Sequence, residues 1–88
     1  MKLSETQQRV LLALAAGQAL KSHRYLSGVK VFRLHPLDGP PQMVRRATVE
    51  SLCSRDLIDS NKKFPTATYW LTQKGTELAA QLKFRKLV

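Results

Sequence analysis

The stretch RRATVESLCSRDLIDS, residues 45–60, decides the fold prediction, because helical spacing gives way to a strand within it. Val49 and Leu52 lie on one face of a helix, which we expect to cover about residues 44–56. The apolar residues at 57–58 then indicate that the chain leaves the helix and enters a β-strand within the core.

The segment IDSNKKFPTATYWL, residues 58–71, predicts a β-hairpin with its tip at residues 61–66. Alternation along the return strand directs Tyr69 toward the core and leaves Trp70 on the outer side. This hairpin follows the helix directly, so a basic tip would project beside it.

Helices are expected at both ends of the chain. The first covers about residues 4–16, with Ser4 as N-cap and Gln7 completing a capping box. The last covers about residues 73–84 and is capped by Thr72.

Between them, residues 20–35 are rich in β-formers and contain a Ser-Gly turn signal at 27–28, which predicts a second hairpin. The alternation favours Val29 and Val31 on the inner face and basic side chains on the outer one, with a slip or bulge near Phe32.

Three of the four prolines lie in HPLDGPPQ, residues 35–42, which predicts a loop. The expected order is helix, hairpin, helix, hairpin (wing), helix. This order predicts one compact α+β domain of winged-helix type over residues 1–88, with its core at about 3–84.

The balance of charge points to an anionic partner. Fifteen Lys and Arg against six Asp and Glu give a net charge of +9, and the pI is near 10.3. For a small basic domain, nucleic acid is the commonest such partner. No apolar run is long enough to cross a membrane, and the polar start MKLS favours a cytoplasmic protein without a signal peptide.

The sequence holds no pattern for catalysis, a metal or a cofactor. The acidic residues are spread singly, and no glycine-rich phosphate loop is present. His23 and His35 are near the ends of the first hairpin and could meet across it, but no Cys or carboxylate completes a metal-ligand spacing. Cys53 is expected to be a small buried core residue.

Three stretches carry a family resemblance: residues 45–60, YWLTQKGTELA at 69–79 and the opening LSETQQRVLLALAAG at 3–17. They resemble the winged helix-turn-helix superfamily of small regulators, the ArsR, MarR and PadR type. The resemblance implies a recognition helix near residue 45, a wing at the second hairpin and a role in transcription regulation.

A β-rich segment stands where that superfamily has a helix, and in this respect the chain is similar to the YjhX-like toxin family. The likeness rests on the LS...Q...L...LA.G opening, the Ser-Gly turn and the late Leu-Ile-x-Ser. It implies a different partner, because that family inhibits DNA topoisomerase I. A protein-binding toxin or inhibitor is therefore the alternative to a DNA-binding regulator.

The candidate site joins the central helix with the tip of the second hairpin. Arginines in the first turn of a recognition helix can reach base edges or phosphates, and tip lysines can neutralise phosphates. The expected contacts to double-stranded DNA are Arg45, Arg46, Thr48, Ser51, Arg55, Lys62 and Lys63. The helix arginines and the tip lysines should lie side by side, and a homodimer is expected. A merely solvated surface is the alternative interpretation.

Overall fold

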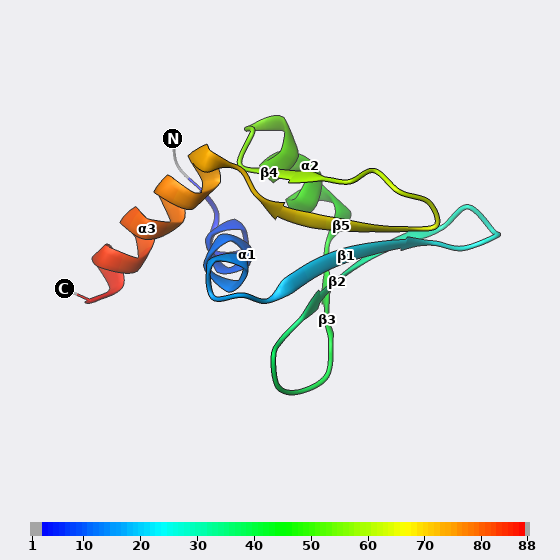
Figure 1. Cartoon of the computed structure of the whole chain (residues 1–88), viewed down its shortest axis with the longest axis horizontal. Coiled ribbons are helices and arrows are strands. Elements are labelled where there is room, and N and C mark those ends of the chain that lie inside the picture. The colour runs from blue at the N-terminus through cyan, green and yellow to red at the C-terminus, as the bar shows by residue number, and fades with distance from the viewer. Residues whose placement is uncertain (1–2, 88) are drawn as a thin grey trace.

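A computed structural model describes residues 3–87 and shows an α+β protein with a five-stranded antiparallel sheet (Figure 1). The elements are α1 (Glu5–Ala15), β1 (Ala19–Arg24), β2 (Lys30–His35), β3 (Gln42–Val44), α2 (Arg46–Ser54), β4 (Ile58–Ser60), β5 (Thr66–Leu71) and α3 (Gln73–Leu87). The strand order is β3-β2-β1-β5-β4. β1 therefore lies at the centre of the sheet, and its pairing with β5 joins the two predicted hairpins.

The first hairpin forms around the predicted turn. Gly28 adopts a φ of +90°, which glycine reaches at little steric cost. Its amide donates to the Tyr25 carbonyl at 2.9 Å, and the Tyr25 amide donates to Val29 at 2.8 Å. These contacts close the connection between β1 and β2.

The predicted inward face of β2 is wrong. Phe32 and Leu34 are buried, whereas Val31 is half-buried on the opposite face and Val29 is 55% exposed in the turn. The pairing of β1 with β2 runs without interruption, so neither a slip nor a bulge occurs at Phe32. Phe32 is opposite Ser22, whose small side chain leaves room for the ring within the core.

The third strand was not expected. The sequence indicated a loop through Gln42 and a helix starting at Val44 or Arg45, but β3 pairs with β2 and places Val44 opposite Phe32. Arg45 remains extended, at φ −68° and ψ 141°, so α2 begins only at Arg46. A three-residue strand is too short for alternation to reveal it.

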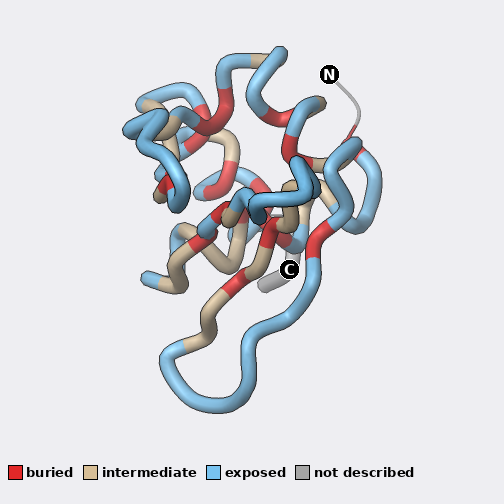
Figure 2. The backbone as a smooth tube through the Cα atoms, turned by 90° about the vertical axis from the view of Figure 1, so that its right-hand side faces the viewer, coloured by how far each residue is buried: buried red, intermediate tan, exposed pale blue. Residues whose placement is uncertain are grey.

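The core lies on one face of the sheet, beneath the three helices. The buried strand residues form one cluster with Val10 and Leu11 of α1, Val49 and Leu52 of α2, and Ala79 and Leu82 of α3. Figure 2 shows these buried positions in the interior and the connection from β2 to β3 largely exposed. The opposite face of the sheet carries no helix of the described chain.

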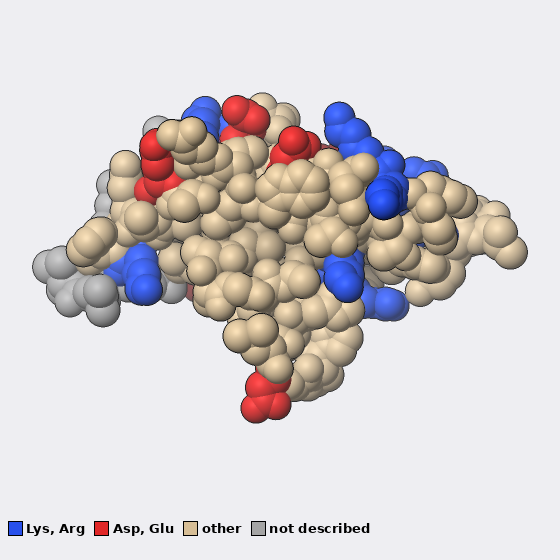
Figure 3. All heavy atoms as spheres, viewed as in Figure 1, with Lys and Arg blue, Asp and Glu red and all other residues tan. Residues whose placement is uncertain are grey.

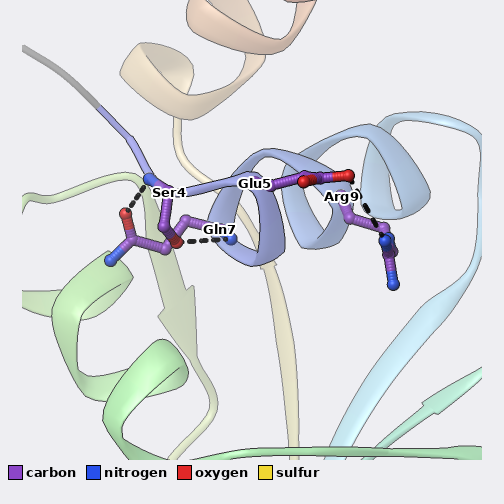
Figure 4. Close-up of polar contacts among 4 residues, drawn as sticks. All are labelled: Ser4, Glu5, Gln7 and Arg9. Carbon is purple, nitrogen blue, oxygen red and sulfur yellow. Dashed lines mark hydrogen bonds and ion pairs between the residues drawn. The ribbon is translucent and has the colours of Figure 1, made fainter.

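The capping box of α1 is confirmed (Figure 4). The Gln7 amide donates to the Ser4 hydroxyl at 3.2 Å, and the Ser4 amide donates to the Gln7 side-chain carbonyl at 2.9 Å. The ion pair of Arg9 with Glu5, at 3.7 Å, is exposed and adds little. Two helix amides that have no partner within the helix are thus satisfied locally.

The predicted cap of α3 is also present, and it docks the helix onto the segment between α2 and β4. The Thr72 hydroxyl accepts from the Gly75 amide at 3.0 Å and donates to the Asp56 carbonyl at 2.6 Å. A Cβ at Gly75 would collide with the backbone carbonyl of Leu57. The close approach explains the glycine in the first turn of this helix.

Replacing this glycine should therefore cost stability. Gly75→Ala is expected to lower the free energy of unfolding by about 2 kcal/mol or more, because backbone atoms must separate to admit the methyl group. Gln73→Ala, an exposed change in the same turn, is the matched control. Urea unfolding of both variants measures the difference, and equal stabilities would contradict the proposed close contact.

Candidate nucleic-acid interface

The two arginines at the start of α2 have different surroundings. Arg45 is exposed at the N-cap position, and its side chain makes no capping hydrogen bond. Arg46 donates from Nε to Glu50 at 2.7 Å across one turn of the helix. The neighbouring carboxylate offsets part of the charge that Arg46 would offer to a phosphate.

The remaining predicted contacts on α2 are less available than expected. Ser51 was expected to contact DNA, but it is half-buried and accepts a 2.7 Å hydrogen bond from the Gln7 side chain of α1. That bond joins α1 to α2, a contact that the sequence pattern does not predict. Thr48 and Arg55 are half-buried as well. The outward surface of α2 is therefore smaller than its sequence suggested.

Lys62 and Lys63 project from an ordered connection between β4 and β5. Asn61 organises it, because its side-chain oxygen accepts from the amides of Lys63 and Thr68, both at 3.2 Å. The Lys62 amide donates to the Ser60 hydroxyl at 3.2 Å. Both lysine side chains are exposed, so their charges are offered to solvent from a fixed backbone.

The strand order contradicts the expectation that the α2 arginines and these lysines lie side by side. Arg45 follows β3 at one edge of the sheet, and Lys62 follows β4 at the other edge. Three strands lie between them, a separation of about 19 Å along the sheet at a spacing of about 4.8 Å per strand. The crossing of α2 from one edge to the other causes this separation.

The sheet instead brings the two long hairpins together. β1 pairs with β5, and the Arg24 amide donates to the Pro65 carbonyl at 2.9 Å near the tips. Lys30 of the first hairpin and Lys62 of the second line one hollow of about 510 Å³ on the core side of the sheet. Lys62 therefore has Lys30 as a basic neighbour, from a segment that was not predicted to join it, and Asp56 and Asp59 line the same hollow.

Both hairpins are poor in acidic residues, and among their described strand residues Asp59 of β4 is the exception. Residues 17–35 and 60–72 hold six basic residues and no Asp or Glu, namely Lys21, Arg24, Lys30, Arg33, Lys62 and Lys63. We call these six residues the hairpin surface. In the view of Figure 3, Lys and Arg atoms gather toward the hairpin end of the molecule, with acidic atoms next to them at its upper edge.

Four members of the hairpin surface were missed as site residues: Lys21, Arg24, Lys30 and Arg33. Local spacing cannot show that β1 lies beside β5, since that pairing joins positions more than forty residues apart, such as His23 and Thr66. One available signal was the absence of acidic residues between Glu5 and Asp38.

The helix-free face of the sheet carries a second group of polar and aromatic side chains. Arg33 donates to the Tyr25 hydroxyl at 3.4 Å, and the Tyr25 and His23 rings pack edge to face at a centroid distance of 4.7 Å. His23 also contacts the Thr66 hydroxyl at 3.0 Å. His35 lies two rows away, opposite Ala19, so the two histidines do not meet.

Among residues 3–87, no group of three or more His, Cys, Asp or Glu is arranged to hold a metal ion. None of the helices in this range is long and apolar enough to span a membrane. Comparison of the chain with protein-family models, with curated proteins and with solved structures returned no match.

Cys53 does not fill the core position expected for it. It is exposed at the end of α2 and borders the same hollow as Lys30 and Asp59. Partial removal of water raises the pKa of its thiol, and the Asp59 carboxylate raises it further, whereas Lys30 opposes both. The environment thus favours the neutral thiol over the nucleophilic thiolate.

Alkylation should reveal this shift in pKa. The rate of reaction of Cys53 with iodoacetamide is expected to rise at a higher pH in the folded protein than in the urea-unfolded chain, whose thiol has its ordinary, lower pKa. Asp59→Asn should move the folded profile toward lower pH. A folded profile at or below the unfolded one would contradict the assigned environment.

Proposed function

We propose that the protein binds nucleic acid, with double-stranded DNA as its ligand, and that the hairpin surface makes the main phosphate contacts. The observation that carries this proposal is the junction of two hairpins whose segments 17–35 and 60–72 hold six Lys and Arg between them and no acid, while Asp59 precedes the second segment in β4. Basic side chains on adjoining strands neutralise several phosphates at once and release their counterions.

The geometry supports binding from the tip end of the sheet. Arg24 and Lys30 face each other at the turn end of the first hairpin, and the β4–β5 connection with its two lysines lies beside it. Val44 is level with Phe32, so the chain leaves β3 toward the same end and brings Arg45 there. Arg45 then contributes a contact at the far edge of the surface.

This arrangement favours affinity over sequence choice. Backbone contacts position a protein on DNA, whereas base contacts from a helix in the major groove confer specificity. On α2, Glu50 engages Arg46 and the Gln7 side chain engages Ser51, which leaves Arg45 as the best placed side chain for a base edge. We therefore infer a small regulator that acts mainly by occupying DNA.

Salt dependence tests the proposal. In Lys62→Gln with Lys63→Gln, affinity for a short duplex should fall, and the slope of log K against log salt should decrease by about two, one for each lost phosphate contact. Fluorescence anisotropy at several salt concentrations measures both quantities.

Lys74→Gln is the matched control, because Lys74 is exposed in the first turn of α3, at the other end of β5 from the tip lysines. This variant should bind as the unchanged protein does. Arg46→Ala should have a smaller effect than the double change, since Glu50 already offsets its charge. Absence of duplex binding at low salt, or a slope that is the same in all variants, would refute the proposal.

A second candidate function is inhibition of a nucleic-acid enzyme such as DNA topoisomerase I. The observation that favours it is apolar exposure at the adjoining tips, where Leu26 is fully exposed and Phe64 is 72% exposed. Such side chains suit a protein partner. Inhibition of purified topoisomerase I at equimolar ratio, unchanged by added competitor DNA and lost in Leu26→Ser with Phe64→Ser, would support it over DNA binding.

A further inference from the structure

The helix-free face of the sheet is a continuous platform with a regular arrangement of side chains. One row across the strands contains Thr68, Lys21, Arg33 and Met43, and the next contains Thr66, His23 and Val31. These rows contain no acidic side chain. The only acid among the strand residues on this face is Asp59, in the edge strand β4.

Aromatic rings stand toward both ends of this platform. Trp70 on β5 is 45% exposed, and Tyr25, after the end of β1, is 41% exposed and packs on His23. Trp70 and Thr66 are four residues apart on one strand, which corresponds to about 13 Å, and Thr66 contacts His23. The two aromatic positions are thus separated by a distance that a few unstacked nucleotides can span.

Positive charge lies between these rings. Lys21 is exposed and Arg33 is half-buried, and they are directly opposite each other on β1 and β2. With His23 and Tyr25 they border a shallow hollow of about 280 Å³. The hollow therefore offers cationic and hydroxyl groups at its rim and ring surfaces at one side.

We propose that this platform binds single-stranded nucleic acid. This proposal rests on the proposed function, nucleic-acid binding, and adds an unpaired strand to double-stranded DNA as a ligand of the protein. Trp70 and the His23–Tyr25 pair would each stack on an unpaired base, while Lys21 and Arg33 contact the intervening phosphates. Base stacking on aromatic rings with cationic contact to the backbone is the general chemistry of single-strand binding.

Unpaired bases fit this face better than a duplex does. In a duplex the base faces are stacked on each other and only their edges are accessible in the grooves, so rings on a sheet find no surface to cover. Charge complementarity favours a polyanion over a second copy of this basic chain, because Lys21 and Arg33 would then face a like-charged surface.

The single tryptophan of the chain makes the test direct, because Trp70 reports on the proposed site itself. Titration with an oligothymidylate of about ten nucleotides, within the site sizes of about 4–16 known for single-strand-binding folds, should quench its fluorescence. A duplex of equal length should bind at the tips, through Arg24, Lys30, Lys62 and Lys63, with at most a small change in emission. Quenching by the single strand supports the proposal, and binding without quenching overturns it.

Variants then separate the platform from the tips. Lys21→Gln with Arg33→Gln should weaken binding of a labelled oligothymidylate at least about tenfold, the loss expected for two charge-assisted contacts. Lys74→Gln, on α3, should leave it unchanged. Trp70→Ala should weaken binding, and Trp70→Phe should restore part of the affinity, because a phenyl ring still stacks. Circular dichroism confirms that each variant is folded.

The outcomes distinguish this proposal from the broader one. If neither ligand binds at low salt, nucleic-acid binding itself fails. If the duplex binds and the single strand does not, or if the Lys21 and Arg33 changes leave single-strand affinity intact, only the platform proposal fails. A dimer that dissociates in Trp70→Ala would also overturn it, since the face would then be an interface between copies.

Discussion

Pairing of β1 with β5 is the interaction on which the rest of the structure depends. It joins the first hairpin to the second across more than forty residues and makes one sheet from two halves of the chain. Ser22, only 2% exposed, and Ala67 face each other at this junction, and their small side chains leave the volume that Phe32 and Tyr69 fill. All three helices pack against the cluster that results.

Features set by neighbouring residues could be predicted from the sequence. The capping box at Ser4, the turn at Gly28 and the cap at Thr72 each depend on contacts within about four residues, and all three are present. The outward position of Trp70 followed from alternation along one strand. The α+β class followed from the order of these local signals.

Features set by distant pairing could not be predicted in the same way. The inward position of Phe32 depends on Ser22 opposite it, β3 depends on the free edge of β2, and the burial of Ser51 depends on Gln7. The same limit affected the candidate site. Lys62 and Lys63 were recognised as basic tip residues, but their neighbours are the cations of the first hairpin, because strand order and not helix position decides what lies beside them.

One measurement tests most directly whether the two hairpins act as a single nucleic-acid surface. Amide chemical shifts of the isotope-labelled protein, followed during titration with a short DNA duplex, report the contact region residue by residue. We expect the largest changes at residues 21–33 and 61–68, in both hairpins together, with α3 unaffected beyond its first turn. Changes confined to α2 or to α3, with both hairpins silent, would contradict this account.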